Sequence, residues 1–179
     1  MYDHIIMRFT DILMAFPSIL LGIGLVAALG ASLTNIILVI AIVRLPTMTR
    51  VIRADTLVVK NYDFIEASRA IGASDLRTIM RHVFPNTLQS MIVMASLGLG
   101  QAIILEAAFG FLGLGVQPPR PSWGNLLAEG QEFLQVAPHA SIFPGIFVAL
   151  LALSFNLIGD SVRDQLDPRR QSTRQSMTT

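Results

Sequence analysis

The apolar residues of this chain form long stretches and do not alternate with polar ones. Three windows of about 20 residues contain no Asp, Glu, Lys or Arg, at 12–31, 86–105 and 140–159. A helix of about 20 apolar residues crosses roughly 30 Å of hydrocarbon and satisfies its own backbone hydrogen bonds there. Proline and glycine interrupt each window, which membrane helices tolerate. We therefore predict a transmembrane helix at each window.

A fourth apolar window, 32–51, contains Arg44 and Arg50. An arginine at the bilayer centre costs about 2.5 to 3.5 kcal/mol on insertion scales. Arg44 lies in the second half of the window, where its guanidinium can extend toward the nearer surface. We predict a fourth span here, with a re-entrant segment as the alternative. The predicted fold is an all-α polytopic membrane protein, with residues 1–179 in one transmembrane domain.

Composition supports a membrane protein, and the placement of charge gives its direction. Hydrophobic residues make up 53% of the chain, and the mean hydropathy is +0.60. The N-terminus has one basic residue, two acids and no small-residue cleavage site, so a cleaved signal peptide is not predicted. With the N-terminus inside, twelve of the 13 lysines and arginines lie on the cytoplasmic side, and Arg120 is left outside. This bias predicts cytoplasmic termini, an inner loop at 51–85 and an outer loop at 106–139.

The sequence lacks the residue patterns of metal, nucleotide and catalytic sites. It contains no cysteine, and its three histidines are widely separated, so neither a thiolate metal site nor a histidine cluster is predicted. No GxxxxGK[ST] stretch is present to hold ATP phosphates. The glycine-rich stretch 110–115 follows no strand, so helix packing or a turn is favoured over nucleotide binding. No catalytic residue, metal or cofactor is predicted, and we expect the chain not to be an enzyme.

The inner loop contains a polar, helix-compatible segment. Residues 61–86 read NYDFIEASRAIGASDLRTIMRHVFPN. A first helix is predicted over 63–71, and Gly72 permits a sharp turn. Ser74 or Asp75 can cap a second helix that runs to residue 83, before Pro85 stops it. The segment is predicted to form a helical hairpin on the cytoplasmic face, with a simple solvated connector as the alternative.

These residues resemble the EAA loop of binding-protein-dependent ABC importer permeases. The pattern is Glu66-Ala67-Ser68, three residues, Gly72, and then Phe84-Pro85. FTDILMAFPSILL, ILEAAFGFLGLGVQPPRPSWGNLLAEG and FNLIGDSVRDQLDPR are similar to the dipeptide and oligopeptide branch in the same order. Ser68 replaces the commoner second alanine of the motif, and Arg44 is also a departure. The resemblance covers residues 6–169.

The resemblance implies a type I ABC importer permease fold that lacks the first spans, as in the C-terminal portion of a longer protein. It implies a bacterial inner-membrane permease that works with a second similar permease, two ATP-binding subunits and a periplasmic solute-binding protein. Surrounding lipid is a further partner, and no nucleic acid is expected. Seven residues of the 60–85 coupling loop are implied to contact the ATPase: Glu66, Ala67, Ser68, Gly72, Ala73, Ser74 and Asp75.

The outer loop contains two candidate residues. A proline-rich stretch leads into a short helical pattern with Trp123 at headgroup depth. Glu106, at the end of the third window, is a candidate polar group of the translocation pathway, or simply a solvated carboxylate. In the family that the chain resembles, this outer loop faces the periplasmic solute-binding protein. The sequence leaves open whether the loop docks that protein or lines the translocation pathway.

The predicted cargo is a short peptide. Nickel or another small solute remains open, because related permeases import such solutes. The rival of a different class is a helical membrane enzyme or a structural membrane protein, for which Arg44 and Glu106 would be the candidate residues.

Overall fold

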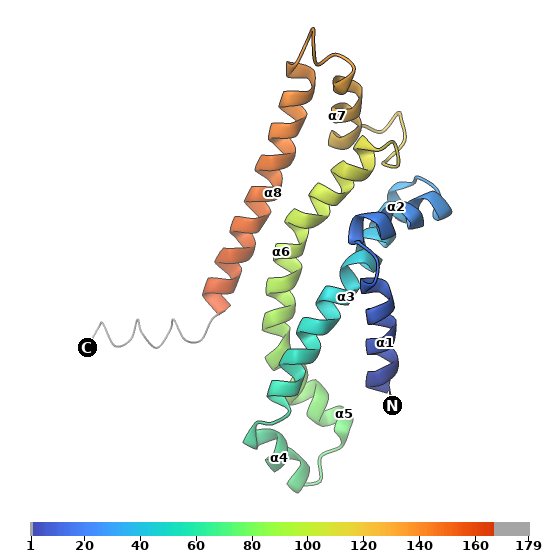
Figure 1. The fold of residues 1–179 in the computed structure, drawn as a ribbon. Coiled ribbons are helices and arrows are strands. Elements are labelled where there is room, and N and C mark those ends of the chain that lie inside the picture. Colours follow the sequence, from blue (N-terminus) through green and yellow to red (C-terminus); the bar gives the residue numbers. More distant parts are fainter. Residues whose placement is uncertain (1, 167–179) are drawn as a thin grey trace, which may run out of the picture. The chain divides into compact units, whose positions relative to one another are not determined.

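The computed structural model describes residues 2–166, and every regular element in that range is helical (Figure 1). The all-α prediction is therefore confirmed. The predicted cytoplasmic C-terminus, with Arg169, Arg170 and Arg174, lies outside the described residues. In chain order the elements are α1 (Tyr2–Met14), α2 (Ser18–Leu29), α3 (Leu33–Val59), α4 (Asp63–Ala70), α5 (Asp75–Thr78), the π-helical η1 (Ile79–Val83), α6 (Phe84–Phe111), α7 (Trp123–Gln131) and α8 (His139–Leu166).

Three continuous helices are long and apolar enough to cross a membrane within the described range. They are Leu33–Val59, Asp75–Phe111 and His139–Leu166, and a bent pair at the N-terminal end makes up to four spans. The predicted windows 86–105 and 140–159 each lie within one of these helices, and the window 32–51 does so apart from Ser32. Each helix is longer than its window, because helical hydrogen bonding continues past the point where the sequence becomes polar.

The first predicted window, 12–31, is not a single helix. α1 ends at Met14, α2 begins at Ser18, and the two are bent by 92°. Pro17 precedes α2, has no N–H to donate, and disfavours the helical conformation for the residue before it. Pro46 and Pro144, by contrast, lie inside continuous helices. The presence of a proline therefore does not by itself determine where a membrane helix breaks.

Pro85 does not stop the second helix of the inner loop, as the sequence had predicted. The segment Asp75–Phe111 runs on through η1 into α6. In η1 the Phe84 N–H reaches the Ile79 carbonyl, five residues back. This wider turn gives room to the ring of Pro85, which would otherwise press on the carbonyl of Arg81.

The described residues divide into two compact units, residues 2–46 with 98–156 and residues 47–97 with 157–166. In the first unit, a core forms around the fully buried Phe109, together with Val26, Ile36, Val39, Val43 and Val116. Gly22 of α2 lies against the Phe109 ring so closely that a Cβ there would overlap with it. Glycine thus lets α2 approach α6 in the way small residues promote close helix packing in membranes.

In the same unit, α7 packs against the end of α6 and the start of α8 (Figure 1). A Cβ at Gly124 would lie 2.8 Å from Cα of Gly110, and a Cβ at Gly130 would lie 2.7 Å from the Ala140 carbonyl carbon. The glycine-rich stretch 110–115 thus serves as helix packing and a turn, as predicted. The second unit contains the α4–α5 hairpin, described next.

Candidate functional site

The inner-loop segment forms a hairpin of two short helices. α4 ends in a Schellman motif, in which the Ala73 N–H donates to the Ser68 carbonyl at 3.1 Å and the Gly72 N–H to the Arg69 carbonyl at 2.9 Å. Gly72 has φ of +77°, in the left-handed region that a side chain disfavours. The sequence-predicted turn at Gly72 is therefore present.

The second helix of the hairpin has its own cap. The Ser74 hydroxyl accepts a hydrogen bond from the Arg77 N–H at 3.4 Å, at the start of α5. An N-terminal serine cap of this kind satisfies a backbone donor that the helix leaves unpaired. The chain therefore ends one helix, reverses, and begins the next within four residues.

A buried hydrogen bond joins the two helices. The hydroxyls of Ser68 on α4 and Thr78 on α5 lie 3.1 Å apart, and both side chains are buried. Ile65, three residues before Ser68 on α4, is also buried, with 1% of its surface exposed. Ser68 is thus directed into the hairpin, and its position predicts that it holds the helices together.

The tip of the hairpin presents a mixed apolar and charged surface. Ile71 and Leu76 are 85% and 71% exposed. Of the seven predicted contact residues, Ser68 is buried, Ala73 is partly buried, and the remaining five are exposed: Glu66, Ala67, Gly72, Ser74 and Asp75. The predicted residues thus lie on one hairpin, which also exposes Ile71 and Leu76.

An aromatic contact supports the base of the hairpin. The rings of Phe64 on α4 and His82 in η1 lie 5.9 Å apart, and Tyr62 lies 5.5 Å from Phe64. His82 therefore has a packing contact within the hairpin. Residues 2–166 contain no group of three or more His, Cys, Asp or Glu placed to hold a metal ion.

The two outer-loop candidates border the same cavity, which belongs to the first unit. Glu106, near the end of α6, and Trp123, at the start of α7, both line a space of about 480 Å³. Ser122 lines the same cavity and caps α7 by accepting from the Asn125 N–H at 3.2 Å. The sequence placed these residues in one loop, and the structure places them at one site.

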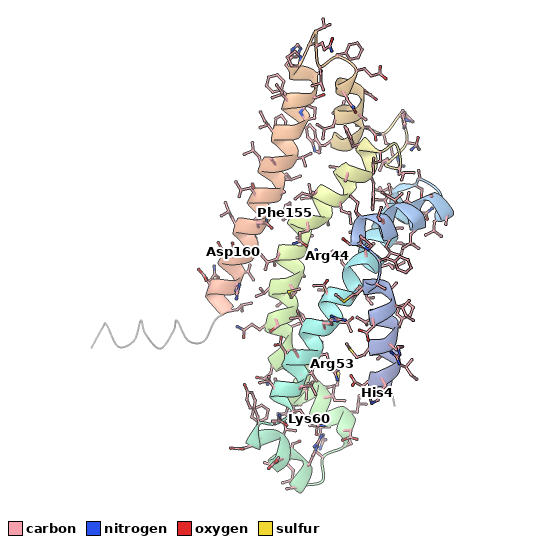
Figure 2. The ribbon with its side chains drawn as sticks, in the orientation of Figure 1. His4, Arg44, Arg53, Lys60, Phe155 and Asp160 are labelled. Atoms are coloured by element: carbon pink, nitrogen blue, oxygen red, sulfur yellow. The ribbon has the colours of Figure 1, made fainter. Side chains whose placement is uncertain are left out.

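Arg44 lies in α3, and its guanidinium is next to α6 (Figure 2). A Cβ at Gly98 would be 3.0 Å from one of its terminal nitrogens, so the absence of a side chain at Gly98 leaves room for the guanidinium. The sequence suggested that the guanidinium would extend toward a surface, whereas the structure packs it against a neighbouring helix. The sequence around Arg44 does not reveal that a glycine of a different helix leaves room for its guanidinium.

Sequence reasoning missed three residues of the hairpin: Thr78, Ile71 and Leu76. A hydroxyl ten residues after Ser68 is a weak signal by itself. Ile71 and Leu76 gave a stronger signal, since these apolar residues flank a polar turn where solvent exposure is expected.

Comparison with known proteins gives the family. A family model described as "Binding-protein-dependent transport system inner membrane component" matches residues 1–172. The glutathione transport system permease protein GsiD of Shigella flexneri serotype 5b (strain 8401) is 46% identical over 168 residues, which cover 94% of this chain and 55% of that protein. GsiD of Escherichia coli O1:K1 / APEC is 45% identical with the same coverage. The chain spans about half the length of these curated relatives.

The match extends well beyond the hairpin, because it includes the membrane helices on both sides of it. The resemblance inferred from the EAA-like pattern is thereby confirmed. With three or four apolar helices within residues 2–166, this chain belongs to the family of binding-protein-dependent transport system inner membrane components.

Proposed function

We propose that this chain is a permease subunit of an ATP-driven importer and that its α4–α5 hairpin receives the movement of a separate ATPase. The observation that carries the proposal is the hairpin tip, where Ile71 and Leu76 are exposed on a structure whose backbone groups are satisfied internally. Exposed apolar residues rimmed by polar ones are typical of a protein-binding surface. Exposure to lipid does not explain them, because the hairpin also carries Glu66, Arg69 and Asp75.

The hairpin is built to transmit force. Ser68 and Thr78 hold α4 against α5, and the Schellman turn defines the angle between them. α5 then continues through η1 into α6 without an interruption, giving one helical segment from Asp75 to Phe111. A displacement of the tip would therefore act directly on a membrane-spanning helix. A flexible connector would absorb it instead.

Charge complements the apolar contact. Glu66 is exposed on α4 and offers a carboxylate to a basic residue of the ATPase. Asp75 adds a second carboxylate at the start of α5. The chain has no GxxxxGK[ST] motif, so ATP hydrolysis is assigned to the partner subunits and the permease itself is not an enzyme.

The remaining partners follow from the family. Two ATP-binding subunits, a second permease and a periplasmic solute-binding protein would complete the importer in the bacterial inner membrane. The relatives' name specifies glutathione transport. We extend this only to the class of short peptides and similar small solutes.

Co-purification with the ATP-binding subunits tests the proposal. The tagged chain is co-expressed with the permease and ATPase subunits of its transporter, and bound ATPase is quantified after solubilisation. We expect Leu76→Ser and Glu66→Lys each to lower ATPase recovery by tenfold or more, because truncating a central apolar contact or reversing a desolvated charge costs about 2 to 5 kcal/mol.

Val136→Ser is the matched control for the apolar variant. Val136 is 88% exposed, as open as the tip residues, but lies between α7 and α8. It should leave ATPase recovery unchanged. Parental recovery from both hairpin variants would make the hairpin a simple connector and contradict the proposal.

Reporter fusions test the orientation of the chain. A reporter inserted within residues 73–77 or fused after Arg170 should read cytoplasmic, and one after Pro121 should read periplasmic. This orientation is expected because lysine and arginine are strongly biased toward one side of the membrane. A periplasmic signal from the hairpin insertion would be incompatible with contact to an ATPase.

A further inference from the structure

The cavity beside α7 has a composition suited to a small cationic ligand. Its volume of about 480 Å³ falls in the usual range for small-molecule sites. Leu33, Val116, Pro121 and Leu126 give it mainly apolar walls, and of its lining residues Glu106 alone is ionisable. No cationic side chain from the described part of the chain lines it.

The Glu106 carboxylate retains the capacity to accept further hydrogen bonds. A carboxylate offers about four lone-pair sites, and Ser122, which lines the same cavity, has one hydroxyl proton and can donate to at most one of them. The same hydroxyl accepts from the Asn125 N–H, and the Asn125 amide donates to the Val116 carbonyl at 2.6 Å. The Ser122 and Asn125 side chains thus hold the loop, and a charged carboxylate in an apolar cavity is stabilised by a cationic partner.

The aromatic wall favours the same kind of ligand. The Trp123 ring borders the cavity and stacks on Phe147 of α8, with centroids 5.1 Å apart and an interplanar angle of 17°. Stacking holds the indole in place, and indole is the side chain that attracts cations most strongly through its π system. A carboxylate and an indole on one cavity are therefore complementary to an ammonium group and not to an anion.

The walls are held by close backbone contacts. A Cβ at Gly124 would lie 2.8 Å from Cα of Gly110, and a Cβ at Gly115 would lie 2.9 Å from the Gly110 backbone nitrogen. These glycines hold the start of α7, with Ser122 and Trp123, against the end of α6, with Glu106. A site with such preformed walls loses little free energy to reorganisation when a ligand enters.

We propose that this cavity binds a primary ammonium group through Glu106 and Trp123, as presented by the N-terminus of a peptide or by an amino-acid derivative. The assignment of this group to the transported solute rests on the function proposed above. The binding event itself requires neither ATP nor a partner subunit. A purely structural role, in which Glu106 only anchors α7 through Ser122, predicts no such binding.

Trp123 is the single tryptophan of the chain, so its fluorescence reports on the cavity directly. The chain is reconstituted in lipid nanodiscs and titrated with L-leucinamide, which carries a primary ammonium, and with N-acetyl-L-leucinamide, which is uncharged. We expect a saturable change with leucinamide and at least tenfold weaker binding of the acetylated probe, because a hydrogen bond between charged groups is lost.

Substitutions at Glu106 provide a second test of the proposed site. Glu106→Gln should weaken leucinamide binding at least tenfold, and Glu106→Asp should restore part of it. Glu129→Gln is the matched control, since Glu129 is an exposed carboxylate on α7 that does not line the cavity, and it should bind like the parent.

Equal binding of the two probes, or leucinamide binding that survives in Glu106→Gln, would overturn the proposal. The probe comparison uses the unaltered chain, so it decides the question even where a variant fails to fold. Successful titration together with failed ATPase co-purification would keep the site and remove the importer proposal. The reverse result would keep the importer and remove the site.

Discussion

Gly72→Val is expected to abolish recovery of the ATP-binding subunits and transport, while the chain still reaches the membrane at parental levels. Gly72 has φ of +77°, and a residue other than glycine held in that region costs on the order of 1 to 3 kcal/mol, most for a β-branched one. No atom lies within 4 Å of the position a Cβ would take, so the effect would come from backbone strain and not from a clash.

We expect the hairpin to relieve that strain by changing its turn, because Gly72 is exposed and no neighbouring side chain packs on it. A changed turn moves Leu76 relative to Ile71 and separates Ser68 from Thr78, whose hydroxyls are 3.1 Å apart. The measurement is ATPase co-purification together with substrate-stimulated ATP hydrolysis in the complete transporter. Gly72→Asn should be milder, since asparagine tolerates positive φ.

Gly113→Val is a closely matched control. Gly113 follows α6 with φ of +75°, and no atom lies within 4 Å of its Cβ position. Its turn has the same Schellman pattern, with the Leu114 N–H donating to the Phe109 carbonyl at 2.8 Å and the Gly113 N–H to the Gly110 carbonyl at 3.0 Å. The same strain at Gly113 should leave ATPase recovery intact. Equal loss in both variants would attribute the effect to general destabilisation.

Phe109→Ala is expected to produce the largest loss of stability among single substitutions in the first unit. Phe109 is fully buried among Val26, Ile36 and neighbouring side chains. Phenylalanine-to-alanine changes cost about 3 to 5 kcal/mol in soluble cores, as a transfer term plus a cavity term. In a bilayer the cavity and lost packing remain, because helix association there depends on van der Waals contact. We therefore expect on the order of 3 kcal/mol.

Thermal unfolding in nanodiscs, followed by Trp123 fluorescence, measures this effect. Phe111→Ala is the control: Phe111 is on the same helix, loses the same atoms, and is 42% exposed. It should change stability by less than about 1 kcal/mol. Comparable losses from the two variants would mean that the packing of α2 and α3 around Phe109 does not stabilise the unit.

Much of the architecture could be predicted from the sequence, because membrane insertion imposes simple rules. A charge-free run of about 20 residues has few structural options in lipid, so the windows 86–105 and 140–159 predicted spanning helices. The hairpin was also predictable from local chemistry. Gly72 needs positive φ, and Ser74 caps a helix, and both features depend on residues only a few positions away.

Helix ends and breaks were harder to predict, because hydropathy marks the lipid layer and not the end of hydrogen bonding. The sequence alone does not explain why Pro17 coincides with a 92° bend while Pro46 and Pro144 lie within continuous helices. Pro85 is accommodated by the π turn over Ile79–Val83.

The sequence by itself determined that the chain is a helical membrane protein, that it has an EAA-like hairpin, and which family it resembles. Each of these depends on composition or on residues close together in the chain. Only the tertiary structure decided that Ser68 meets Thr78, that Gly98 makes room for Arg44, and that Glu106 and Trp123 border one cavity. Such contacts join residues of different helices, and their partners are selected by packing geometry, which no local pattern in a single sequence encodes.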